Sequence, residues 1–431
     1  MSVSLILLIG CLLALLVLGF PVAWAMLLAM TAWIAWTDQW AFLPLMPERI
    51  YQGMDVFVLM SVPLFVLAGE LVNTAGITRR LVDLANLLFG WMRGGLAQVN
   101  IATSVLFSGI TGVALGDVAA LGRIFIPEMI KQGYSAPYAA AVTAASAVIG
   151  PMIPPSLIAI IYGSISSVSI AGIFLATIVP GLLLSALLML VVSLQSDKRT
   201  LTVEQPDRSM SGVLRVSRSA FLPLLIPVII LTGIIGGAMT PTEAGAVAAF
   251  YALVLSAFIY RNLTLKSLAG SFGSSAMFSG QMLIIVGCGA AFSWALGVEN
   301  VPEQLGATIA NLNFGPLGTL LVFNAILLVL GMFIDPTAVI ILFGPVLSMA
   351  AVMVGIDPLH FAVIAILNLN IGLITPPLGV CLFAAERIAG CGLVPLLRAI
   401  VPFLLVQLVV LLLVSAFPTL SLWLPNFVGA G

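Results

Sequence analysis

Long apolar runs recur along the whole chain, separated by short stretches of Gly, Pro and polar residues. A helix of about 20 apolar residues crosses the hydrocarbon core of a bilayer, so runs of this length predict membrane-spanning helices. The apolar segments are about 3–19, 20–37, 57–75, 98–133, 136–162, 170–195, 219–238, 241–260, 274–297, 316–354, 357–386 and 395–417. The pattern therefore predicts an all-α polytopic membrane protein.

Two of these segments are interrupted in the middle. The interruptions fall at 108–112 and 116–117 in the segment 98–133, and at 331 and 335–337 in the segment 316–354. Because Gly, Pro and acidic residues break helices, each segment is expected to form two pieces that are short for a full span. We interpret both as re-entrant helical hairpins. Irregular backbone at membrane depth is tolerated only where protein buries it or where it lines a watery cavity, so the hairpins mark a predicted site.

The placement of basic residues supports the hairpin interpretation. If each interrupted segment enters and leaves the membrane on one side, 13 of the 15 Lys and Arg residues lie on the same side. Arg49 then lies opposite, and Arg123 lies within the first hairpin. A single crossing of 98–133 would instead split the basic group. Since cytoplasmic loops are rich in Lys and Arg, this side is predicted to be cytoplasmic and both termini periplasmic.

The two halves of the chain carry related motifs at a steady offset. Pro154-Pro155 and Pro376-Pro377 lie 222 residues apart, and Asp117 and Asp335 lie 218 residues apart. Five crossings and one hairpin in each half would bring the second half in from the opposite face of the membrane. Secondary transporters commonly contain such inverted-topology repeats, with sites built from discontinuous helices near the midplane.

The predicted organisation is two inverted repeats joined by a cytoplasmic loop. The first repeat covers 1–197, the connecting loop 198–218 and the second repeat 219–431. Each repeat holds one hairpin and, after it, one helix broken by a Pro-Pro pair. The broken helices are expected at about 136–162 and 357–386.

Composition excludes several other classes. The chain is 62% hydrophobic and 7% charged, with a mean hydropathy of +1.25, whereas soluble domains carry about 25% charged residues. The 15 basic residues form no stripe, so no nucleic-acid partner is expected. A membrane-embedded enzyme would need a nucleophile and base or a metal cluster, and the chain has one His and no Cys-x-x-Cys pair.

Each hairpin, combined with its neighbouring Pro-Pro break, supplies hydroxyls, freed backbone carbonyls and one carboxylate. These groups suit a hard cation such as Na⁺, and helix N-termini at the same cavity suit an anionic group. The predicted sodium-binding residues are Ser108, Gly109, Thr111, Gly112, Asp117, Gly150, Pro151, Ile153 and Pro154 in the first half, and Gly331, Asp335, Thr337, Gly372, Thr375 and Pro376 in the second. The alternative is that each break is a structural kink satisfied by neighbouring helices and water.

Two further acids lie within apolar segments. A carboxylate inside a membrane costs several kcal/mol unless it is paired or solvated, so each is a functional candidate. Glu243 starts a segment, where a first-turn acid is also favoured by the helix dipole. Glu70 could instead lie near the interface and bind a neighbouring subunit.

Several motifs together resemble a known family. They are the stretches 60–70 (MSVPLFVLAGE), 108–117 (SGITGVALGD), 150–156 (GPMIPPS), 240–245 (TPTEAG) and 374–379 (ITPPLG). In combination they resemble the large membrane subunit of a tripartite ATP-independent periplasmic (TRAP) transporter, over essentially the whole chain. The resemblance implies a bacterial inner-membrane protein that takes up a small organic anion such as a sialic acid, a C4-dicarboxylate or a sulfonate.

The resemblance also implies a mechanism and partners. It implies an elevator in which the two hairpins and broken helices move against a scaffold, driven by a Na⁺ gradient. A separate small membrane subunit of about four helices and a soluble periplasmic binding protein that delivers the substrate are expected. The residues expected to meet the substrate are Thr111, Ser156, Glu243 and Asp335. The alternatives are a proton-coupled organic-anion carrier or a channel that needs no binding protein.

Overall fold

The computed structural model describes residues 3–195, 209–301, 303–304, 307 and 314–429, and in these ranges the chain forms helices, turns and no strand. The all-α prediction is therefore confirmed for this part of the chain. Eight helices here are long and apolar enough to cross a membrane, or nine if the bent pair Ala136–Met152 and Leu157–Ser166, at 42° to each other, counts as one span.

The first half of the chain contains these elements: α1 (Val3–Val17), α2 (Val22–Thr37), η1 (Trp40–Phe42), α3 (Leu45–Met54), η2 (Phe57–Met60), α4 (Ser61–Thr74), α5 (Thr78–Phe89), α6 (Gly95–Thr111), α7 (Ala114–Lys131), α8 (Ala136–Ala147), η3 (Gly150–Met152), α9 (Leu157–Ser166) and α10 (Ile170–Gln195). The second half contains α11 (Met210–Ile235), α12 (Pro241–Val254), the π-helix η4 (Leu255–Ile259), α13 (Leu265–Val298), α15 (Gly315–Phe333), α16 (Pro336–Met353), α17 (Pro358–Gly372), α18 (Val380–Ala389), α19 (Leu393–Ala416) and α20 (Thr419–Val428).

The predicted connecting loop 198–218 is only partly described. Residues 198–208 lie outside the described ranges, and the residues that follow are helical from Met210, where α11 begins. The helix starts this early because the side chain of Ser209 accepts a hydrogen bond from the backbone N–H of Gly212, 3.1 Å away. Such an N-cap satisfies a donor that the first helical turn would otherwise leave free.

Both interrupted segments form pairs of helices that pack against each other. The pair α6 and α7 turns at Gly112, whose φ of +61° favours glycine, and the pair α15 and α16 turns at Ile334 and Asp335. Helix lengths are 17 and 18 residues in the first pair and 19 and 18 in the second. The expectation of short pieces is wrong for α15 and α16, which are both long and apolar enough to cross a membrane, whereas neither α6 nor α7 meets that length and composition.

Polar side chains join each helix pair to the broken helix beside it. In the first half Ser104 on α6 donates to Ser146 on α8, 3.0 Å away. In the second half Asn368 on α17 donates to the side chain of Asn324 on α15, 2.8 Å away. The two bonds occupy matching places, since the paired positions are 220 and 222 residues apart. These buried bonds fix how each broken helix lies against its helix pair.

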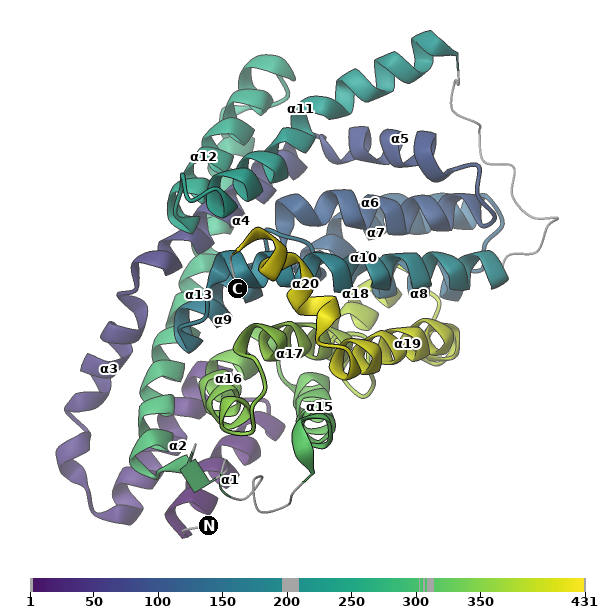
Figure 1. Ribbon diagram of the computed structural model, residues 1–431. Helices are drawn as coiled ribbons and strands as arrows, with labels where there is room; N and C mark the ends of the chain where they lie inside the picture. The colour runs from purple at the N-terminus through teal and green to yellow at the C-terminus, as the bar shows by residue number, and fades with distance from the viewer. Residues whose placement is uncertain (1–2, 196–208, 302, 305–306, 308–313, 430–431) are drawn as a thin grey trace.

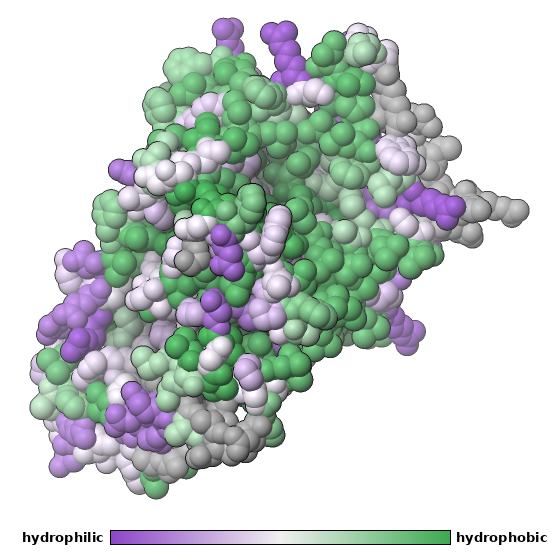
Figure 2. Space-filling view, viewed as in Figure 1, coloured by the Kyte–Doolittle hydropathy of each residue, from purple (hydrophilic) through white to green (hydrophobic). Residues whose placement is uncertain are grey.

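The helices form one elongated body in which both pairs lie against α8, α17, α10 and α19 (Figure 1). A second group, α3, α4, α12 and α13, packs along one flank (Figure 1). The face seen in Figure 2 carries broad apolar areas, and exposed side chains include Leu182, Phe250 and Phe258. Large exposed apolar surface is what lipid contact requires, because lipid tails do not penalise it as water does.

Candidate functional site

The tip of the first helix pair is inserted against the break between η3 and α9. A Cβ atom added at Gly112 would collide with the carbonyl oxygen of Pro155 and would lie 3.2 Å from the Cα of Ser156. A Cβ at Gly109 would lie 3.7 Å from the carbonyl oxygen of Pro154. Gly112 is therefore needed for close backbone approach, whereas Gly109 makes room for the side chain of Pro227 on α11, whose Cβ would lie 2.8 Å from an added Cβ.

Asp117 lies under this tip with 1% of its surface exposed. The hydroxyl of Thr111 donates to its Oδ1 atom over 2.5 Å. Its Oδ2 atom is buried and has no hydrogen-bond partner among the described residues. A Cβ atom added at Gly150 would overlap this Oδ2 atom, so the free oxygen points at the backbone of the break.

The break also leaves backbone acceptors free. No backbone N–H in the described part of the chain is seen to donate to the carbonyls of Pro154 and Pro155, because the backbone is extended at Ser156 and the N–H of Ala159 donates to the Ser156 hydroxyl instead. A buried carboxylate oxygen without a partner is a costly arrangement unless a cation or a proton satisfies it. The first predicted set is therefore brought together in space.

The remaining residues of the first predicted set are Ser108, Pro151 and Ile153, which pack around the tip and the break. Ser108 is buried, and its hydroxyl donates to the carbonyl of Val105 on its own helix, 2.7 Å away. Pro151 is buried within η3. Ile153 is extended and half-buried, and a Cβ added at Gly181 of α10 would lie 3.1 Å from it.

The second set is built in a related way but is more open. A Cβ atom added at Gly372 would lie 2.5 Å from the carbonyl carbon of Gly331, so the two helix ends touch through their backbones. Asp335 caps α16, since its Oδ1 atom accepts from the backbone N–H of Thr337 over 2.9 Å. The hydroxyl of Thr375 donates to its own helix, at Ile371. Unlike Asp117, Asp335 is exposed, because it stands at the turn and not beneath it.

Cys381 was not among the predicted site residues, but it lies within electrostatic range of the acid of each set. Cys381 is fully buried on α18, which packs against α7 and α8. The carboxylates of Asp117 and Asp335 both lie close enough to interact electrostatically with its thiol. The backbone N–H of Cys381 donates to the carbonyl of Leu373 at the second break. Its place soon after the Pro-Pro pair was the only sequence signal for it.

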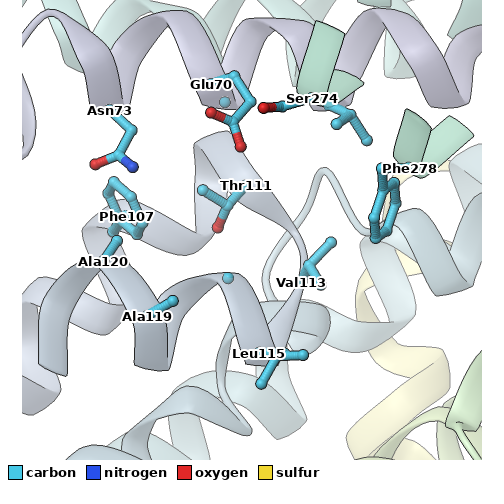
Figure 3. A pocket seen from close by; sticks show the side chains of 13 residues that line it. Glu70, Asn73, Phe107, Thr111, Val113, Leu115, Ala119, Ala120, Ser274 and Phe278 are labelled. Carbon is cyan, nitrogen blue, oxygen red and sulfur yellow. The ribbon is translucent and has the colours of Figure 1, made fainter. Parts of the chain in front are cut away.

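A pocket of about 280 Å³ opens beside the first tip, between α4, α13 and the α6–α7 pair. Thr111 lies on its floor, and Figure 3 shows the Glu70 carboxylate pointing into it, toward Thr111 and Ser274. Asn73 and Phe278 also line it. The sequence pointed to Thr111 and Glu70 but not to Asn73, Ser274 or Phe278, because these residues come from helices far apart in the chain.

The four predicted substrate residues do not line one pocket. Of the four, only Thr111 lines the pocket in Figure 3. Ser156 is buried, and its hydroxyl accepts from the backbone N–H of Ala159 as the N-cap of α9. Glu243 is exposed, and its Oε2 atom accepts from the backbone N–H and the hydroxyl of Thr240, at 2.8 and 2.9 Å, in a capping box. Their contact with substrate stays a prediction.

Comparison with known proteins decides the family. The family model described as "Tripartite ATP-independent periplasmic transporter, DctM component" matches residues 9–420. The chain belongs to this family. The recognition made from the motifs is thereby confirmed, and this TRAP permease is a multi-pass membrane protein and a transporter subunit, not an enzyme.

Relatives carry names with several substrates. The chain is 39% identical to the sialic acid TRAP transporter large permease protein SiaM of Vibrio cholerae, over 97% of this chain and 98% of that protein. It is 35% identical to the C4-dicarboxylate TRAP transporter large permease protein DctM of Pseudomonas aeruginosa, over 88% and 89%. It is also 35% identical to the isethionate TRAP transporter permease protein DctMQ of Oleidesulfovibrio alaskensis, over 95% of this chain and 64% of that protein.

A solved structure shares the fold of this TRAP permease. The Alcanivorax borkumensis YdaH transporter superposes with a TM-score of 0.64 at 14% identity, covering 87% of this chain and 88% of that chain. At this identity the likeness concerns the fold alone.

Proposed function

We propose that this TRAP permease takes up a small organic anion by secondary active transport coupled to Na⁺, in the bacterial inner membrane. A periplasmic binding protein delivers the substrate, and a small membrane subunit completes the transporter, as the family implies. The anion is a carboxylate, such as a sialic acid or a C4-dicarboxylate, or a sulfonate, by analogy with the named relatives.

One observation carries the Na⁺ coupling. The Oδ2 atom of Asp117 is buried without a partner, and the free carbonyl of Pro155 faces the same tip. Hard cations are bound by carboxylate and carbonyl oxygens. Na⁺ at this place would satisfy both groups, with Oδ1 held in position by Thr111.

The coupling follows from the charge that must move. A carboxylate inside the membrane costs several kcal/mol, and a bound Na⁺ cancels its charge. The loaded unit can then cross more easily than the unit that carries a bare carboxylate. Differential affinity of ion and substrate for the two positions couples the ion gradient to the substrate.

The matching halves support an elevator. The helix pairs, the Pro-Pro breaks and the bonds Ser104–Ser146 and Asn368–Asn324 recur at nearly one offset. We propose that they form two inverted repeats whose helix pairs are re-entrant and move together, with both termini periplasmic. The flank of α4, α12 and α13 would then be scaffold, and the pocket with Glu70 and Thr111 would lie between mobile and fixed parts.

A proton-coupled carrier is the second candidate, and Asp117 itself favours it. A protonated carboxyl group also fits a buried site with one hydrogen-bond donor and one unpaired oxygen. Na⁺ and H⁺ would then compete for the same carboxylate. The driving ion must be decided by transport measurements.

The test is uptake of radiolabelled organic acids into liposomes that contain the permease and its small subunit. The cognate binding protein presents the substrate, and an inward Na⁺ or H⁺ gradient is applied separately. We expect uptake to need both Na⁺ and the binding protein, and Asp117→Asn to lower it at least tenfold, which corresponds to about 1.4 kcal/mol.

Asp38→Asn is the matched control. Asp38 is exposed after α2 and has a φ of +54°, a conformation that Asn tolerates as well as Asp. Uptake driven by a proton gradient without Na⁺ would reject the Na⁺ coupling and favour the second candidate. Normal Na⁺-driven uptake by Asp117→Asn would reject the assigned ion site and leave the family function intact.

A further inference from the structure

A basic pocket lies far from the hairpin tips, between α5, α11 and the end of η4. Its volume is about 600 Å³, and it is lined by Arg80, Arg215 and Arg218 together with Ser211, Ser219 and Tyr260. Figure 1 shows α5 and α11 side by side at this place. None of the groups assigned to transport lines it.

The wall of this pocket is held in a defined shape. The guanidinium of Arg80 lies 3.8 Å from the centre of the Tyr260 ring. The hydroxyl of Tyr260 donates to the backbone carbonyl of Ser219, 3.2 Å away. These contacts tie α5 to the end of η4 and tie η4 to α11, so the arginines are presented on a preformed surface.

Among the residues that the structure describes, the lining of the pocket is basic. No Asp or Glu lines it, and within the described ranges none of its three arginines forms an ion pair. Asp83, one turn along α5 from Arg80, interacts electrostatically with Arg79 and Arg80. Several guanidinium groups around one cavity favour a phosphate, which they can bind through paired N–H donors.

The pocket also lies at the depth where a lipid headgroup would be found. On α11 the basic residues end at Arg218, and the apolar span begins with Phe221, which is 59% exposed. On the neighbouring helix the exposed apolar residues Phe258 and Ile259 give way to Tyr260 and Arg261. Polar and apolar surface therefore change over at the pocket, as they do at the boundary between headgroups and acyl chains.

We propose that this pocket binds an anionic phospholipid, with the headgroup phosphate on Arg80, Arg215 and Arg218 and the acyl chains along the exposed apolar residues beside it. Basic pockets between membrane helices bind anionic headgroups in this manner. The exposed Leu214 and Ile259 on the pocket wall favour a lipid over free phosphate, because a soluble ion makes no use of apolar surface. This site is independent of the transported anion.

The test is a titration of the purified full-length chain with phosphatidylglycerol, followed by native mass spectrometry to obtain an apparent Kd. Each basic side chain near an anionic surface contributes about a factor of five in affinity. We therefore expect the double variant Arg215→Gln with Arg218→Gln to bind phosphatidylglycerol about thirtyfold more weakly. The control double variant Arg387→Gln with Arg398→Gln removes the same charge outside the pocket and should stay within twofold of the wild type.

The double variant Arg215→Lys with Arg218→Lys keeps both positive charges and controls for misfolding. It should retain most of the affinity for phosphatidylglycerol. Unchanged binding in the Gln pair would overturn the proposal, as would phosphatidylcholine binding as tightly as phosphatidylglycerol. Full competition by inorganic phosphate would assign the pocket to a soluble anion instead. Loss of a co-purifying membrane protein from the Gln pair, with the lipid count unchanged, would assign it to a protein partner.

Discussion

Gly150 offers the sharpest test of the proposed ion site, because adding one methyl group there acts on a single carboxylate oxygen. A Cβ atom at this position would overlap Oδ2 of Asp117 and lie 3.3 Å from its Cγ. The backbone of Gly150 is helical with negative φ, so alanine is tolerated conformationally. Asp117 has no free space to retreat into, since it is 1% exposed and held by Thr111.

The cost of this overlap sets the expected effect. Overpacking a well-packed interior costs about 1–3 kcal/mol. Na⁺ binding at the proposed site requires the Asp117 carboxylate in its native position. We therefore expect the overpacking energy to appear as a loss of Na⁺ binding free energy. With about 1.4 kcal/mol for each factor of ten, Gly150→Ala should weaken Na⁺ binding about 5- to 150-fold.

The assay is the Na⁺ concentration that gives half-maximal uptake in liposomes, measured with the shift in thermal unfolding that Na⁺ produces. Gly344→Ala is the control, because this buried glycine on α16 has no atom closer than 3.6 Å to an added Cβ. We expect the control to keep the wild-type Na⁺ dependence. A correctly inserted Gly150→Ala protein with unchanged half-maximal Na⁺ would refute the assignment of Asp117 as the Na⁺ ligand.

Two further predictions concern hydrogen bonds near the site and at the flank. Thr111→Val removes the hydroxyl that donates to Asp117 and leaves a buried acceptor unpaired, so it should lower the free energy of unfolding by about 1–3 kcal/mol. Thr111→Ser keeps a hydroxyl and should retain the stability of the wild type. An equal loss in both variants, measured by thermal unfolding, would contradict this role of Thr111. Glu243→Ala should lower the melting temperature because the capping box is lost, whereas Glu243→Gln can still accept from Thr240. Equal melting temperatures for the two Glu243 variants would argue against the helix cap. Reduced uptake by Glu243→Gln at an unchanged melting temperature would support the predicted contact of Glu243 with the substrate.

Much of the first set of predicted sodium-binding residues could be found from the sequence. Gly, Pro and an acid in the middle of an apolar segment are incompatible with a continuous helix in lipid, so Asp117 and the Pro154-Pro155 break stood out without any structure. The structure brings them together as predicted, with Gly112 and Gly150 at the points of closest approach.

Other predictions failed or fell short for physical reasons. Apolar periodicity does not show where a helix begins, and the cap at Ser209 extended α11 into the predicted loop. Glu243 and Ser156 read as possible ligands because their types suit ligands, but both complete helix caps, which only hydrogen-bond geometry reveals. Residue type alone does not separate these roles.

The sequence by itself determined that this chain is a membrane protein, that matching motifs recur in its two halves, and which breaks in the apolar segments mark a candidate site, because lipid imposes a few strong rules on length, charge and backbone pairing. Only the tertiary structure decided which oxygen of Asp117 is free, that Cys381 is buried within electrostatic range of both acids, and that Glu70 shares a pocket with Thr111. Such contacts join helices distant in the chain, and they depend on how side chains pack at close range, which no periodicity along the sequence records.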